Sequence, residues 1–147
     1  MLLVSLDMYS SIVNKIKSKG LIMSVEHNKM LVMRFLNEFM IGHDIKVLDE
    51  LLGPSYKQHN PGLDHGKASL IKFFQDFWEI YPKPGYYLKR MIAEGDLVAI
   101  HYHFQPDPNE EGYAIVDIFR VENGKLVEHW DVCQEIPDKS ENNSPMF

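Results

Sequence analysis

The fold of this chain is decided by residues 112–136, which read GYAIVDIFRVENGKLVEHWDVCQEI. Two runs of β-branched and aromatic residues flank Glu122-Asn123-Gly124, and Asn-Gly between such runs is the strongest short-range signal for a β-hairpin. Both arms also carry polar groups: Asp117 in the first and Glu128, His129 and Asp131 in the second. Because burying an unpaired carboxylate or imidazole costs several kcal/mol, these groups either face water or line a cavity that uses them.

The register of the hairpin decides which side chains share a face. A two-residue Asn-Gly turn places Asp117 opposite Trp130, whereas a type I turn with Gly124 in a left-handed bulge places Asp117 opposite His129. We favour the bulged turn because it gathers the ionisable groups. The polar face is then expected to hold Ile115, Asp117, Phe119, Val127, His129 and Asp131, and the mostly apolar face Val116, Ile118, Leu126, Trp130 and Val132.

Bulk composition indicates a single folded domain of 147 residues, 45% of them hydrophobic and 12% aromatic. The net charge of −6 argues against nucleic acid as a partner, since nucleic-acid binding needs a basic surface. No apolar run approaches the ~20 residues that span a bilayer, so no membrane association is expected. Cys133 is the sole cysteine, which excludes an intrachain disulfide and fits a cytoplasmic location.

Helical periodicity precedes the strands. We expect helices over residues 24–40, from about residue 44 to 52, and over residues 67–81, where aromatic residues recur at helical spacing. Strands are expected at residues 55–60, 86–93 and 97–105, ahead of the hairpin. Residues 1–22 are assigned to an N-terminal extension with a weak helix at 7–19, residues 23–137 to the domain, and residues 138–147 to a flexible tail.

Helices followed by an antiparallel meander predict an α+β fold. The sheet must curve around the helices, which gives a cone-shaped α+β barrel with a curved, mainly antiparallel sheet. Such a cone encloses the kind of concave site that binds small molecules.

Three segments carry a family resemblance: DIKVLDELLGPSYKQHNPGLDHG at 44–66, MIAEGDLVAIHYHF at 91–104 and VDIFRVENGKLVEHWDV at 116–132. In order and spacing they resemble the SnoaL-like polyketide cyclases of the nuclear transport factor 2-like superfamily, over roughly residues 25–136. The resemblance implies the cone fold and a homodimer formed through the outer sheet face. It also implies aldol ring closure without metal or organic cofactor, with Asp117 matching the family's strand carboxylate and His103 its histidine.

The residues themselves support a site around Asp117, whose pKa desolvation would raise towards a value useful for removing a proton beside a carbonyl. The alternative is a structural Asp117 paired with Arg90 or Arg120. His101 and His103 alternate along one predicted strand, so both point to the same face, which we expect to line the cavity.

Further substrate-binding candidates lie in other elements. His59 and Asn60 suit binding of a carbonyl or hydroxyl group, although Asn60 before Pro61 fits an Asx-turn equally well. His129 either pairs with Asp131 in the site or lies at the solvent end of its strand. The apolar wall is expected to include Tyr56, Phe77, Trp78 and Phe119.

Three functions follow as hypotheses. The first, which we adopt, is a cofactor-free enzyme for cyclisation, isomerisation or dehydration of a small apolar carbonyl compound. The second is a binding protein with the same cone and no chemistry. The third is a metal enzyme in which His101, His103 and His129 converge, prompted by the G-x5-H-x-H spacing from Gly95 to His103, though the later Glu and Gly of a cupin motif are missing.

Overall fold

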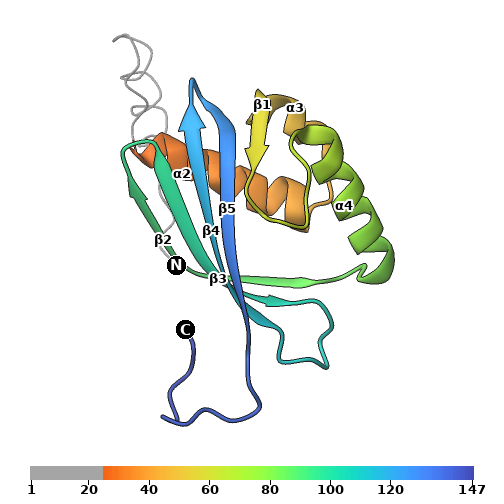
Figure 1. The fold of residues 1–147 in the computed structure, drawn as a ribbon, viewed down its shortest axis with the longest axis vertical. Coiled ribbons are helices and arrows are strands. Elements are labelled where there is room, and N and C mark those ends of the chain that lie inside the picture. The colour runs from red at the N-terminus through yellow and green to blue at the C-terminus, as the bar shows by residue number, and fades with distance from the viewer. Residues whose placement is uncertain (1–24) are drawn as a thin grey trace, which may run out of the picture.

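The helices lie along one face of a bent five-stranded sheet in the computed structural model, which describes residues 25–147 (Figure 1). The helical elements are α2 (Val25–Arg34) with its π-helical continuation (Phe35–Ile41), a 3-10 turn (Ile45–Val47) leading into α3 (Leu48–Leu51), and α4 (Lys67–Ile80). The strands are β1 (Leu52–Gln58), β2 (Gly85–Glu94), β3 (Leu97–Gln105), β4 (Tyr113–Glu122) and β5 (Lys125–Glu135). The predicted extension at 1–22, with its helix at 7–19, lies outside the described residues.

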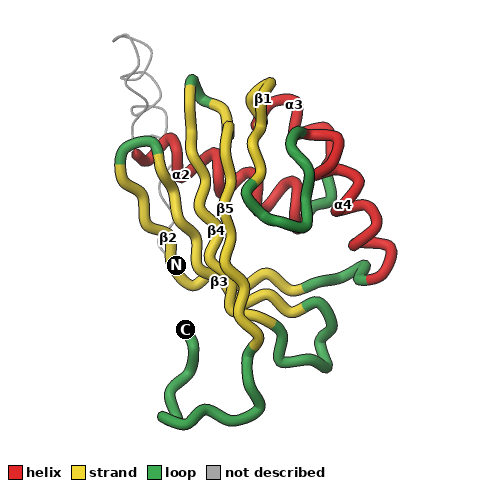
Figure 2. Tube along the Cα trace, in the orientation of Figure 1, coloured by secondary structure: helices red, strands yellow, loops and turns green. Residues whose placement is uncertain are grey.

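The sheet order is β1-β5-β4-β3-β2. Strand β1 pairs with β5 in parallel, and all other neighbours are antiparallel. Figure 2 shows the long strands bending around the helices. Among the described residues, the helices cover one sheet face, the inner face, and no helix covers the other, the outer face. The α+β prediction with a curved, mainly antiparallel sheet is therefore confirmed. The predicted strand at 55–60 begins earlier, at Leu52, because α3 ends at Leu51.

The turn of the β4–β5 hairpin differs from the one we favoured. Glu122 pairs with Lys125, and Asn123 and Gly124 both have positive φ, 51° and 73°. This is the two-residue primed turn, whose backbone twist matches that of the flanking strands. The predicted type I turn with a bulge at Gly124 is therefore wrong.

A bulge does occur in this hairpin, but within β5. Val121 pairs with Leu126 and Arg120 pairs with Glu128, so Val127 is the extra residue. Asp117 consequently lies opposite Asp131, where neither predicted register placed it. The predicted grouping of Ile115, Asp117, Phe119, His129 and Asp131 on one face holds. Leu126 was predicted on the opposite face but is buried in the core, because the bulge resets the alternation of side chains.

An aromatic cluster joins the helices to the sheet. Phe35 contacts Phe39 and Phe119 with ring centroids 5.1 and 5.2 Å apart, and Phe39 contacts Phe74 of α4 at 4.8 Å. Phe39 and Phe119 are fully buried. This packing forms the part of the core that holds the helices against the inner sheet face.

The described residues contain no helix with both the length and the apolar character needed to cross a membrane. Residues beyond Ile136 form no helix or strand. Their last side chain, Phe147, packs against His101 and His103 on the outer face.

Candidate active site

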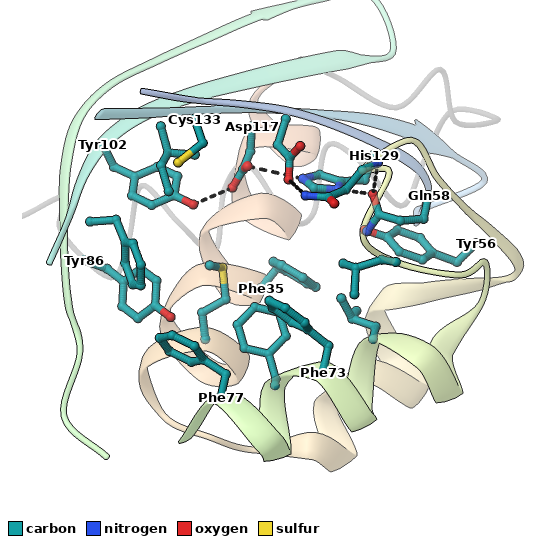
Figure 3. A pocket seen from close by; sticks show the side chains of 18 residues that line it. Phe35, Tyr56, Gln58, Phe73, Phe77, Tyr86, Tyr102, Asp117, His129 and Cys133 are labelled. Atoms are coloured by element: carbon teal, nitrogen blue, oxygen red, sulfur yellow. Dashed lines mark hydrogen bonds and ion pairs between the residues drawn. The ribbon is translucent and has the colours of Figure 1, made fainter. Parts of the chain in front are cut away.

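A cavity of about 200 Å³ lies between the inner sheet face, the π-helical continuation of α2 and helix α4 (Figure 3). Most of its wall is apolar and aromatic. That part comprises Phe35, Met40, Leu63, Leu70, Phe73, Phe74, Phe77, Phe104 and Ile115. The polar lining gathers on the sheet side and comprises Tyr56, Gln58, Asn60, Tyr86, Tyr102, Asp117, His129, Asp131 and Cys133. A small, largely apolar ligand with one polar end fits such a lining.

Asp117 lies on the side of the cavity formed by the sheet, which we call its floor, with only 5% of its surface exposed. The Tyr102 hydroxyl on β3 donates a 2.9 Å hydrogen bond to Oδ2. Oδ1 lies 3.3 Å from Nε2 of His129 on β5. Arg90 and Arg120, the structural partners considered above, instead contact His101 and Glu128. Both oxygens of Asp117 therefore have proton-carrying groups as neighbours.

His129 bridges Asp117 and strand β1. Its ring is buried, and Nδ1 lies 2.7 Å from Oε1 of Gln58. The same Oε1 accepts the backbone N–H groups of His59 and Asn60, each at 3.1 Å. Gln58 thus holds both the imidazole and the backbone at the end of β1 in place.

Asp131 is the second carboxylate of the site, directly across the strand pair from Asp117. Asn60 donates from Nδ2 to its Oδ2 at 2.5 Å. One donor or acceptor atom each from Asp117, His129 and Asp131 lie within 4.8 Å of one another. Each of these three side chains has a partner from another strand or loop, so the cluster is oriented before any ligand enters.

The hydroxyl groups of the cavity stay protonated at neutral pH. Burial, and then the negative charges of Asp117 and Asp131, raise the pKa of Tyr56 well above its usual range. Burial and Asp117 raise the pKa of Tyr102 in the same way, and that of Tyr86 also rises. Burial together with Asp131 and Asp117 raises the pKa of the Cys133 thiol. Tyr56, Tyr86 and Tyr102 can therefore serve as hydrogen-bond donors.

Five of the predicted site residues line the cavity: Asp117, Asn60, His129, Tyr56 and Phe77. Asn60 combines the two interpretations left open above, since its Oδ1 accepts the Gly62 N–H of an Asx-turn while its Nδ2 binds Asp131.

His101 and His103 do not face the cavity, which corrects the prediction. Tyr102 and Phe104 line it, so strand alternation turns both histidines to the outer face. There His103 Nε2 lies 2.7 Å from the Glu111 carbonyl oxygen, and His101 Nδ1 lies 2.6 Å from Arg90. The small residue Ala99 belongs to the same outer face.

The remaining three predicted residues also lie away from the cavity lining. His59 stacks on Trp130 at 4.6 Å and contacts Glu128 at 2.8 Å, and this contact, with Arg120, lowers the pKa of Glu128. Trp78 packs beside Phe39 with the ring of His43 stacked on it. Phe119 is buried beneath the floor, where its ring lies 4.8 Å from that of His129.

The predicted metal set is not assembled, because His129 lies on the inner face and His101 and His103 on the outer face. The cluster that the fold does assemble has one imidazole and two carboxylates, all held by neighbouring side chains. This arrangement suits proton transfer.

Sequence reasoning missed Tyr102, Gln58 and Tyr86. Tyr102 alternates with His101 and His103, and this alternation, combined with the inward direction of Asp117 on the paired strand, was the signal that could have found it. Nothing in the sequence marked Gln58, since its role depends on the parallel pairing of β1 with β5, where it lies beside His129.

Comparisons with known proteins agree with this architecture. The model of the SnoaL-like domain family matches residues 32–129. No curated protein matches the chain. Among solved structures, TsrD from Streptomyces laurentii is similar with a TM-score of 0.63 and 22% identity, covering 76% of this chain and 90% of that one.

Two further structures show the same fold. A candidate ketosteroid isomerase from Kribbella flavida has a TM-score of 0.66 and 18% identity, over 84% of this chain and 91% of its own. A candidate polyketide cyclase from Bacillus cereus has a TM-score of 0.64 and 21% identity, over 73% and 74%. Since the family model covers most of the described domain, this chain belongs to the SnoaL-like domain family.

Proposed function

We propose that the protein is an enzyme that moves protons on a small apolar carbonyl compound held in the cavity, without a cofactor. The reaction class is aldol cyclisation, isomerisation or dehydration, all of which begin with removal of a proton beside a carbonyl. The observation that carries the proposal is the buried Asp117 carboxylate, which meets the Tyr102 hydroxyl and the His129 imidazole at the floor of an apolar cavity.

In this mechanism Asp117 is the general base. Burial in a largely apolar site keeps competing water away from the carboxylate and holds it beside the bound ligand. His129 and the cavity tyrosines lie on the same floor and donate hydrogen bonds to the enolate oxygen as charge develops on it. The family resemblance implied His103 as the histidine that assists Asp117, and we assign this role to His129.

Two of the neighbours named above support a carbonyl compound as the substrate class through their names. One is a candidate polyketide cyclase and the other is a candidate ketosteroid isomerase. At 21% and 18% identity they share the fold with this chain. The proposed chemistry is therefore supported by the cavity and by the cluster of Asp117, His129 and Asp131.

The test is deuterium uptake in D2O at the carbon beside the carbonyl, measured by NMR on a panel of aryl alkyl ketones. We expect the wild-type protein to accelerate uptake for ketones that bind. Asp117→Asn is expected to lower the rate by about 10²–10⁴-fold, the usual contribution of a general base, while ligand affinity and melting temperature stay close to wild type. Asp138→Asn, in the exposed tail, is the matched control.

A second candidate is a ligand-binding protein without chemistry, which the largely apolar cavity favours by itself. It predicts ketone binding with no acceleration of deuterium uptake in wild type. It also predicts that Asp117→Asn behaves like the wild-type protein.

We further propose that two copies pair through the outer sheet face. Tyr87, Ile92 and Val132 are exposed large side chains on the outer sides of β2 and β5, with 50%, 65% and 68% of their surfaces accessible. Sedimentation of the wild-type chain and of Val132→Asp tests this, with a dimer expected for the first and a monomer for the second.

A further inference from the structure

We propose that Gln58 is a positioning residue that holds the His129 hydrogen on Nδ1, so that the contact between His129 Nε2 and Asp117 carries one transferable proton. The inference rests on the proposed proton-transfer function and assigns the general acid of the same site.

Backbone groups identify the oxygen of the Gln58 amide. The Asn60 N–H points at this atom from 3.1 Å, and the His59 N–H, which also donates to the His129 carbonyl oxygen at 2.9 Å, lies 3.1 Å from the same atom. Only the oxygen of a carboxamide accepts hydrogen bonds, so the atom between these two donors is Oε1 and the amide cannot be reversed. Two fixed donors therefore decide the orientation of Gln58.

The position of the ring hydrogen follows from that orientation. Nδ1 of His129 lies 2.7 Å from the same Oε1. An acceptor at this distance requires a hydrogen on Nδ1, because two lone pairs facing each other would repel. The tautomer of His129 is thus set by β1 through Gln58, and Nε2 is left facing Asp117.

The contact with Asp117 then needs a proton of its own. A neutral ring with its hydrogen on Nδ1 would direct the Nε2 lone pair at Oδ1, 3.3 Å away. The contact is attractive only as imidazolium beside carboxylate, or as a protonated Asp117 donating to Nε2. Either form holds two protons, one on Nδ1 and one between Nε2 and Asp117. The other tautomer, in which Nε2–H donates to Asp117 and Nδ1 carries no hydrogen, holds only one.

The described ionisable groups around His129 are negatively charged or neutral. Asp117 on β4 and Asp131 on β5 supply negative charge, and Tyr56 on β1 and Tyr102 on β3 remain neutral hydroxyls. The ring of Phe119 covers one side of the imidazole. None of the described residues that line the cavity is a lysine or an arginine.

The stored proton completes the reaction. Asp117 takes the proton from carbon, the electron pair of the C–H bond forms the enolate, and His129 Nε2–H gives its proton to the oxygen. The carboxylic acid of Asp117 later returns a proton to carbon, and the enol hydroxyl returns one to Nε2. Atoms and charges balance with no further reactant. Without Gln58, Asp117 would still be available as the base, but His129 would lack the additional proton that makes it the acid.

The test is 15N NMR of the imidazole nitrogens in the full chain labelled at histidine, with the His129 signals assigned by comparison with His129→Gln. We expect the wild-type spectrum near neutral pH to show hydrogen on Nδ1 and a second, shared proton on Nε2. Gln58→Leu removes the acceptor, so the ring is expected to become neutral with its hydrogen on Nε2. Gln58→Glu keeps an acceptor oxygen at Nδ1 and is expected to keep the wild-type pattern.

Gln105→Leu is the matched control, since Gln105 binds only the Glu110 carbonyl at the far end of β3. A wild-type spectrum with a bare Nδ1 overturns the proposal, as does a Gln58→Leu spectrum identical to wild type. If Gln58→Leu does not fold, the wild-type and Gln58→Glu spectra still decide, because the proposal requires hydrogen on Nδ1 in both.

The spectra need no substrate, so they separate this inference from the proposed function. Spectra as expected without deuterium uptake in any bound ketone leave the Gln58 assignment standing and remove the enzyme proposal. Where uptake is observed, Gln58→Leu is expected to slow it at least ~10-fold near neutral pH and Gln58→Glu to restore most of it. The alkaline side of the pH profile, where the acid form of His129 is lost, should move to lower pH in Gln58→Leu, a change that a purely structural role would not produce.

Discussion

Tyr102 and Asp117 are joined across strands β3 and β4 by a buried 2.9 Å hydrogen bond from the phenol hydroxyl to Oδ2. The two residues are diagonal neighbours, because the register partner of Tyr102 is Ile115. The bond fixes the rotation of the carboxylate and so directs Oδ1 at His129. The orientation of the candidate base therefore depends on a residue of the neighbouring strand.

Removing this hydroxyl should weaken both the fold and the chemistry. Tyr102→Phe leaves Oδ2 of a buried carboxylate without its donor, and such a loss costs about 1–3 kcal/mol of unfolding free energy. Urea unfolding measures that cost, and ketone deuterium uptake should slow by about tenfold or more. Tyr87→Phe, on the exposed outer face, serves as control and should match wild type in both assays. Equal stability of the Tyr102→Phe and wild-type proteins would contradict this role.

High pH should unfold the protein through its buried tyrosines. The pKa values of Tyr56, Tyr86 and Tyr102 are raised in the folded state, first by burial, whereas in the unfolded chain they titrate near 10.0. Above that pH the unfolded state loses protons that the folded state keeps, so the unfolding free energy falls as pH rises, and it is fully retained below about pH 10. Urea titrations from about pH 8 to about pH 11 measure the slope, which should be shallower in Tyr86→Phe.

The thiol of Cys133 reports on cavity occupation. The Cys133 residue is exposed and borders the cavity, and its pKa is raised by partial desolvation of the thiol and then by Asp131 and Asp117, so little thiolate forms at neutral pH. Alkylation by iodoacetamide should be several-fold slower in the folded protein than in urea, and slower again when a ketone fills the cavity. Because Cys133 is the only cysteine, mass spectrometry follows this site alone. No change in rate on ligand addition would place the ligand elsewhere.

Histidine substitutions separate the two faces of the sheet. His129→Gln should reduce ketone deuterium uptake to near the level of Asp117→Asn, because it removes the proton-carrying partner of Asp117. His103→Gln should retain uptake within about threefold, since its ring contacts Glu111 and Phe147 on the outer face. The opposite result, with His103 required and His129 dispensable, would restore the interpretation based on family resemblance.

Local patterns in the sequence sufficed for the fold. The Asn-Gly turn, the aromatic period of α4 and the alternation in β3 are set by neighbouring residues, and each leads to the observed element. The site was only partly accessible in this way. Asp117, His129 and Asp131 emerge from one hairpin, so their shared face could be argued from strand geometry.

The rest of the site depends on contacts distant in sequence. Gln58 acts through β5, and its partner His129 lies seventy-one positions away along the chain. For His103 the family resemblance supplied a role, but the alternation of Tyr102 and His103 along β3 gives only two opposed faces and no sign of which one is inner. That choice is made by the helices, which cover the face that carries Val98, Ile100 and Tyr102.

Val127, the extra residue in β5, is the reason that three positions rather than two separate Leu126 from the next inward residue, His129. Leu126 is buried in the core, and His129 and Asp131 line the cavity. A deletion of Val127 would turn β5 into a regular strand and leave its pairing with β4 unchanged, so the imidazole and the carboxylate would still point inward. One residue gained or lost between His129 and Asp131 would instead turn the Asp131 carboxylate outward while sparing the turn, the core and the bulge. Descendants of this gene can therefore lose the bulge and keep the active cluster, whereas a change of one residue beyond His129 divides that cluster in a single mutational step.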